Sequence, residues 1–72
     1  MLYIIKIIFG DLLEKMDRNE IDFKYFSYTA LDYLKTGYEK LHSYDKQELD
    51  NTFGPQRVAN LVKSINDAKH LK

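Results

Sequence analysis

The first third of the chain shows apolar residues at the spacing of an amphipathic helix. A helical projection of residues 2–18 gathers seven apolar side chains on one side: Leu2, Ile5, Ile8, Phe9, Leu12, Leu13 and Met16. Gly10 and most of the charged residues fall on the opposite side. This periodicity favours one continuous helix, although a glycine inside a helix costs about 1 kcal/mol.

The same run has a second interpretation, because isoleucine-rich segments favour β-strands. In that alternative, residues 2–9 form a strand, Gly10 ends it, and Asp11 with Glu14 forms a capping box that opens a short helix. The sequence contains no second strand-like run. A strand at residues 2–9 would therefore have to pair across a dimer.

A second helix is predicted from about Asp22, a suitable N-cap, to about His42. Its apolar and small residues are spaced by three and four positions: Phe23, Phe26, Ala30, Leu34, Gly37 and Leu41. Gly37 lies on this apolar side. Its missing side chain either permits the close approach of another helix or marks a local fraying point.

Two further helices are predicted in the last third of the chain. Asp45 and Glu48 have the spacing of a capping box and would open a short helix that ends near Phe53. Gly54 then ends that helix and Pro55 begins the next, which is the favoured order of these two residues. The final helix, roughly residues 55–70, carries Val58, Leu61, Val62, Ile65 and Ala68 on one face. The fold class expected is all-α, a single domain over residues 1–72 with three to four helices.

Length and cysteine content point to self-association. The chain has 72 residues and no cysteine, so it has neither disulfides nor thiolate zinc sites. One small core rarely supplies more than about 3–5 kcal/mol of stability. We therefore expect a homodimer. The sequence shows no signal peptide, and its apolar start is too short to span a bilayer, so a cytoplasmic protein without membrane contact is expected.

Catalytic chemistry has no recognisable arrangement in the sequence. The three glycines are scattered singly, and no serine has the glycine flanks of a hydrolase elbow. His42, Asp45 and Glu48 lie around a predicted turn and cap, where the acids have a sufficient structural role. We expect a protein that is not an enzyme and has no metal, cofactor or small-molecule substrate.

The charges argue against nucleic acid as the main partner. Eleven basic residues balance eleven acidic ones, although residues 1–50 carry a net −3 and residues 51–72 a net +3. The segment around Gly54 resembles a helix-turn-helix, with Arg57 and Lys63 as its candidate DNA contacts. Asn60 and Lys63, however, occupy positions where that family has buried aliphatic residues. A small DNA-binding transcriptional regulator is therefore the alternative function.

Aromatic residues give the most informative functional signal. Six tyrosines and four phenylalanines exceed what a small core needs. Tyr25 and Tyr28 are expected to project away from the apolar face of the second helix, toward Asp32, Lys35 and Glu39. Tyrosine is enriched in protein interfaces, so these five residues are a predicted protein-binding surface. In the alternative, the helix is rotated and some tyrosines cover the edges of the core.

The predicted dimer contact lies in the first segment. Tyr3, Ile4 and Ile7 extend its apolar character beyond one face, and such surplus apolar surface is typical of an interface. These three residues are the predicted dimerisation residues.

The amino-acid usage, rich in Ile, Lys, Tyr, Asp and Asn without Trp or Cys, resembles that of small early proteins of phages infecting low-GC Gram-positive bacteria. The resemblance is compositional and transfers no individual residue role. It implies a compact, non-enzymatic inhibitor of host replication, such as of the DNA sliding clamp, or of transcription. The function expected is a protein-binding module that regulates or inhibits a larger partner protein.

Overall fold

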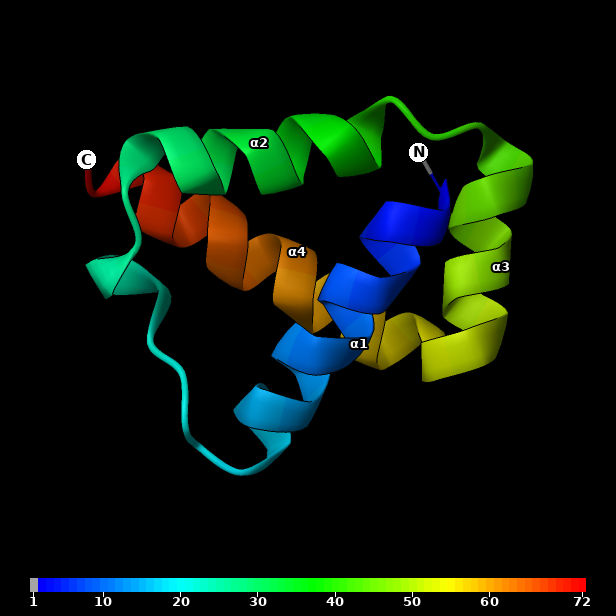
Figure 1. The fold of residues 1–72 in the computed structure, drawn as a ribbon, viewed down its shortest axis with the longest axis horizontal. Coiled ribbons are helices and arrows are strands. Elements are labelled where there is room, and N and C mark those ends of the chain that lie inside the picture. Colours follow the sequence, from blue (N-terminus) through cyan, green and yellow to red (C-terminus); the bar gives the residue numbers. More distant parts are fainter. Residues whose placement is uncertain (1) are drawn as a thin grey trace.

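The computed structural model describes residues 2–72, which form four α-helices and one short 3₁₀ turn (Figure 1). The elements in chain order are α1 (Leu2–Asp17), η1 (Phe23–Tyr25), α2 (Tyr28–Glu39), α3 (Ser43–Phe53) and α4 (Pro55–His70). These described residues contain no strand. The predicted all-α fold is confirmed, with four helices.

Helix α1 runs without interruption through Gly10, so residues 2–9 are helical and the strand alternative is wrong. Its periodic apolar residues face the interior, with Ile5, Phe9, Leu12 and Leu13 buried. A Cβ atom at Gly10 would lie 3.3 Å from the ring of Phe53 in α3. Gly10 therefore makes room for a neighbouring aromatic side chain, while tertiary packing compensates for its low helix propensity.

Helix α2 starts later than the sequence predicted. The side chain of Asp22 accepts a hydrogen bond from the backbone N–H of Lys24 at 3.0 Å, and thereby caps η1 alone. The chain then extends through Phe26, and the Ser27 hydroxyl caps α2 by accepting from the N–H of Ala30 at 3.1 Å. The prediction of one helix from Asp22 was wrong, because Ser27 supplies a competing N-cap within it.

Helix α3, in contrast, begins earlier than the sequence predicted, at Ser43, with His42 in the N-cap position. Asp45 lies inside the first turn, so the predicted capping box of Asp45 and Glu48 was wrong. The single residue Gly54 joins α3 to α4, with φ +97°, and Pro55 is the first residue of α4. This junction and the extent of α4 agree with the sequence prediction.

Helix α4 lies at the centre and packs against α1, α2, α3 and η1. Helix α2 runs along one side of it, α3 stands at one end, and α1 crosses in front (Figure 1). The buried side chains of the described residues are all apolar. The accessible surface is 4860 Å², close to the roughly 4,700 Å² expected for a folded monomer of 8.6 kDa. The accessible surface of the chain is therefore that of an ordinary monomer of this mass.

Candidate protein-binding surface

The outer side of α1 carries three exposed apolar side chains. Tyr3 is 78%, Ile4 53% and Ile7 62% exposed. Their spacing of three and four residues places them on one side of the helix. The structure thus brings the predicted dimerisation residues together on α1, away from the core.

A shallow apolar groove lies beside this stripe, between α1 and α2. Its lining consists of Ile8, Leu12, Phe26, Ser27, Thr29, Ala30, Tyr33 and Leu34. Ile8 follows Ile4 by one helical turn, so the exposed stripe and the groove are continuous. We call this surface the apolar face and define it by Tyr3, Ile4, Ile7, Ile8, Ala30 and Tyr33.

The α2 part of the apolar face is not among the residues predicted from the sequence. Tyr33 is 57% exposed there, and Ala30 and Ile8, which the periodicity places on core-facing sides, are half-buried. A signal was present, because Phe26, Ala30 and Tyr33 follow one another at spacings of four and three. Whether that side of α2 is buried or open depends on how α1 crosses it, which the spacing alone does not determine.

The charged residues next to the stripe on α1 are paired within the chain. Lys15 lies 3.2 Å from Asp11, and Arg18 lies 3.1 Å from Glu14, each one turn apart. Each pair combines one acid with one base. The apolar face is therefore bordered along α1 by groups that together carry no net charge.

The predicted surface on α2 has a different arrangement. Lys69 of α4 donates a hydrogen bond to Asp32 at 2.7 Å, and Lys35 donates one to the side chain of Asn66. Lys35 also lies 3.7 Å from Glu39. Asp32 and Lys35 therefore link α2 to α4 within the chain.

The contact between Asp32 and Lys69 changes the acidity of both groups. The hydrogen bond and positive charge of Lys69 lower the pKa of Asp32 below its ordinary value. The hydrogen bond to Asp32 in turn raises the pKa of Lys69. Both shifts favour the charged pair. Lys69, one of the basic residues of the last segment, thus holds α4 against α2.

The two tyrosines predicted with these charges lie at one end of that surface. Tyr25 is 80% exposed on η1, and Tyr28 is 52% exposed at the start of α2. The ammonium of Lys69 lies 5.5 Å from the centre of the Tyr28 ring, within cation–π distance. Tyr28 and Glu39 are eleven residues apart, about 16 Å along the helix. Four of the five residues therefore follow the length of α2, with Tyr25 on η1 before its start. The side of α2 that faces α4 is partly occupied by contacts within the chain.

The two candidate DNA contacts lie on α4. Arg57 forms an ion pair with Asp17 of α1 and donates a hydrogen bond to the Phe53 carbonyl at 3.4 Å, whereas Lys63 is exposed. A helix-turn-helix has a turn of three to four residues, but Gly54 alone separates α3 from α4. Neither the turn nor the pairing of Arg57 favours DNA recognition.

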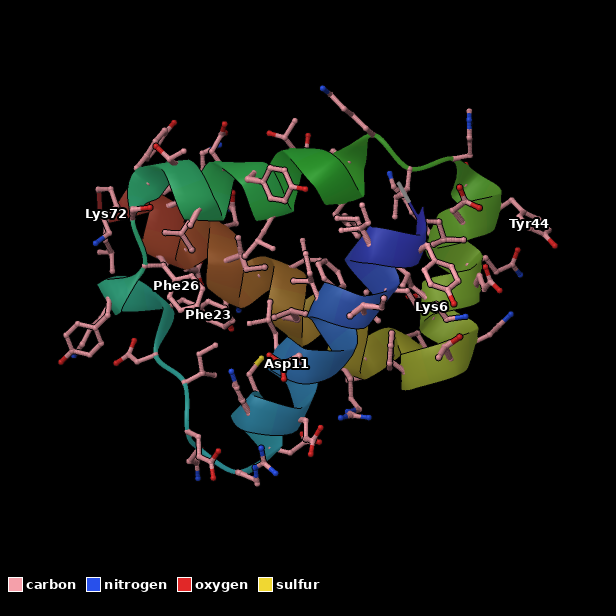
Figure 2. The ribbon with its side chains drawn as sticks, viewed as in Figure 1. Lys6, Asp11, Phe23, Phe26, Tyr44 and Lys72 are labelled. Atoms are coloured by element: carbon pink, nitrogen blue, oxygen red, sulfur yellow. The ribbon has the colours of Figure 1, made fainter. Side chains whose placement is uncertain are left out.

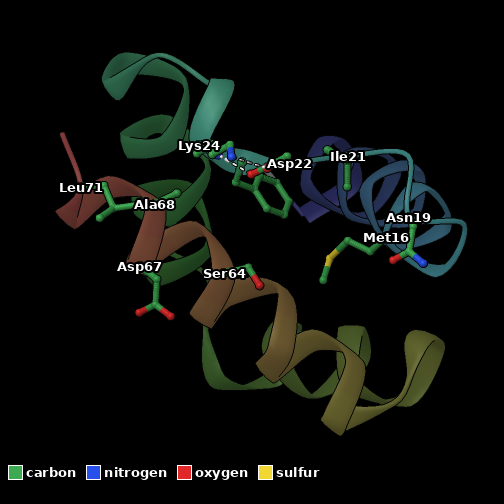
Figure 3. Close-up of a pocket in the computed structure, with 10 residues that line it drawn as sticks. Met16, Asn19, Ile21, Asp22, Lys24, Ser64, Asp67, Ala68 and Leu71 are labelled. Carbon is green, nitrogen blue, oxygen red and sulfur yellow. Dashed lines mark hydrogen bonds and ion pairs between the residues drawn. The ribbon is translucent and has the colours of Figure 1, made fainter.

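A depression lined by both polar and apolar residues lies between the end of α1, the segment before η1 and α4 (Figure 3). Asp22 and Lys24 meet at its edge, where their side chains lie 3.5 Å apart. Asp67 and Ser64 line it from α4. The charged residues at its edge are thus engaged in this local pair.

Three findings complete the description of the surface. Among residues 2–72, no group of three or more His, Asp or Glu side chains is placed to hold a metal ion. None of the helices described is both long and apolar enough to cross a membrane. Comparison with protein-family models, curated proteins and solved structures finds no match to this chain.

Proposed function

We propose that this protein is a non-catalytic protein-binding module that regulates or inhibits a larger partner and acts as a homodimer. The observation that carries the proposal is the apolar face, where the exposed side chains of α1 and Tyr33 of α2 flank the half-buried Ile8 and Ala30 of the groove. Continuous exposed apolar surface on a small domain is characteristic of sites that bind other proteins.

The composition of this face supports a protein partner. Tyr33, on the α2 side of the face, combines large contact area with a polar end, as residues that dominate binding energy at interfaces do. The paired charges of α1 form a polar border beside the aliphatic centre. Such a centre and border are typical of protein interfaces.

The resemblance in amino-acid usage determines which partners we propose first. It points to the DNA sliding clamp or the transcription machinery of a low-GC Gram-positive host, with both proteins in the cytoplasm. The assignment of the larger partner to the Tyr33 side of the apolar face does not depend on this choice of partner.

The test is a calorimetric titration of the protein into purified sliding clamp and, separately, RNA polymerase from such a bacterium. Tyr33→Ser removes an aromatic group from the apolar face, and Tyr44→Ser is the matched control. Tyr44 is 79% exposed and points away from the molecule at α3 (Figure 2). We expect binding to one partner that Tyr33→Ser weakens at least tenfold and Tyr44→Ser leaves unchanged. Failure to bind either partner would contradict the partner assignment, and equal effects of the two variants would contradict the surface assignment.

A further inference from the structure

We propose that the occupant of the outer side of α1 is a second copy of this chain, paired antiparallel about a two-fold axis at Ile7. In this arrangement Tyr3 of each copy faces Asp11 of the other. The inference rests on the proposed self-association and specifies its geometry.

The spacing along α1 suits a two-fold axis at Ile7. Tyr3, Ile7 and Asp11 are each four residues apart and lie on one stripe of the helix. Tyr3 and Asp11 are therefore each about 6 Å from Ile7 along the helix axis, in opposite directions. A two-fold axis at Ile7 brings each Tyr3 opposite the partner's Asp11, as a self-complementary interface requires.

The side chains that this pairing brings together are chemically complementary. Ile7 meets its own copy, and Ile4 adds apolar contact beside it. At each end a tyrosine hydroxyl can donate a hydrogen bond to a carboxylate oxygen of Asp11. Asp11 is exposed, and its Oδ2 forms the ion pair with Lys15. A carboxylate has several acceptor sites, so Asp11 can also accept a hydrogen bond from a tyrosine hydroxyl.

Charge distinguishes the antiparallel arrangement from a parallel one. The first turn of α1 contains no acidic residue, whereas Asp11 and Glu14 lie in its second half. The amino end of a helix is partially positive, so an antiparallel partner places acids beside it favourably. A parallel partner would instead bring Asp11 next to Asp11 and Glu14 next to Glu14, with Lys15 and Arg18 beside these acids in both arrangements.

The available surface is large enough for a stable dimer. A typical specific interface buries about 800 Å² on each partner, or about one sixth of the 4860 Å² surface of this chain. The molecule measures 31 × 26 × 18 Å, and α1 crosses its broad 31 × 26 Å side (Figure 1). No other described element covers Tyr3, Ile4 or Ile7, which remain more than half exposed.

Cysteine cross-linking tests this geometry directly, because the chain has no cysteine of its own. A disulfide requires Cα atoms about 4.4–6.8 Å apart. Under mild oxidation, Ile7→Cys is expected to form a covalent dimer by itself. Tyr3→Cys and Asp11→Cys are expected to cross-link only when the two variants are mixed. Tyr44→Cys on α3 is the exposed control and should remain monomeric on a non-reducing gel.

Two results would overturn the proposed geometry. Self-cross-linking of Tyr3→Cys would show a parallel arrangement, and no cross-linking above the Tyr44→Cys level in either Ile7→Cys or the mixture would show another interface. The mixture retains Ile7, so it reports on the pairing even where Ile7→Cys weakens the dimer. Sedimentation equilibrium of the unmodified chain distinguishes a failure of the proposed geometry from a failure of self-association. A dimer without these cross-links overturns the geometry alone, whereas a monomer overturns self-association as well.

Discussion

Gly37 of α2 lies directly against Ile5 of α1: a Cβ atom at Gly37 would be 2.9 Å from Cδ1 of Ile5. Gly37 is buried, and Ile5 is only 1% exposed. The glycine therefore permits the close approach of α1 and α2, which was one of two roles that its position in the sequence suggested. The groove of the apolar face lies beside this contact, so the packing of these two residues also helps to set its shape.

Substitution of Gly37 by alanine should destabilise the protein by about 1 kcal/mol. Overpacking a filled core costs about 1–3 kcal/mol, while replacing glycine by alanine in a helix gains about 1 kcal/mol. The clash depends on Cδ1 of Ile5, so Ile5→Val should relieve it. In urea unfolding, Gly37→Ala is therefore expected to destabilise the wild type but to stabilise Ile5→Val. A stability change of the same sign in the wild type and in Ile5→Val would show that Cδ1 of Ile5 does not restrict the space at Gly37.

Leu49 should account for most of the attachment of α3. It is the only buried residue of that helix and is completely inaccessible. Replacing a buried leucine by alanine costs about 2–5 kcal/mol, which is comparable to the whole stability of a small domain. We expect Leu49→Ala to be largely unfolded at 37 °C by circular dichroism. Tyr44→Ala on the exposed side of α3 is the control and should change stability by less than about 0.5 kcal/mol.

The contact between Asp32 and Lys69 should make stability depend on pH at both extremes. The folded pKa of Asp32 lies below the ordinary value of 3.8, so its contribution is present above pH 3.8 and disappears as the pH falls through the folded pKa. The pKa of Lys69 is raised above 10.5, so its contribution disappears as the pH rises through that raised value.

Urea unfolding of the wild type and Asp32→Asn between pH 7 and pH 3 measures this contribution. The asparagine keeps the shape of the side chain but cannot carry the charge. We expect the wild type to be the more stable protein at pH 7, and the two urea midpoints to converge as the pH falls. A constant difference between the midpoints over this range would show that the ion pair makes no contribution.

The parts of the fold that the sequence predicts well are those with strong local signals. The periodicity of α1 outweighs its isoleucine content, and Gly54 with Pro55 defines the junction of α3 and α4. The start of α2 was less predictable, because Asp22 and Ser27 are both good N-caps. The spacing of Phe23 and Phe26 fits either choice, whereas the extended backbone at Phe26 and the Ser27 cap place the start of α2 after both rings.

The candidate site was only partly predictable, for a physical reason. Local spacing identifies Tyr3, Ile4 and Ile7 as surplus apolar residues, and the structure shows them exposed. The environment of Asp32 depends on Lys69, which is 37 residues away in sequence. The exposure of Tyr33 likewise depends on the crossing of α1 and α2. Contacts between distant segments therefore determine which side of α2 is occupied and which side is open.

The central claim is that another protein chain, and not water, covers the exposed apolar side chains of α1, which are Tyr3, Ile4 and Ile7. Sedimentation equilibrium of the wild type and Ile7→Lys, from low to high micromolar concentration, tests it most directly. Ile7 is 62% exposed, so the lysine should leave folding unchanged, as circular dichroism can verify. We predict that the wild type approaches twice its 8.6 kDa mass while Ile7→Lys remains a monomer. A wild type that stays at 8.6 kDa throughout, or an Ile7→Lys variant that still dimerises, would contradict the claim.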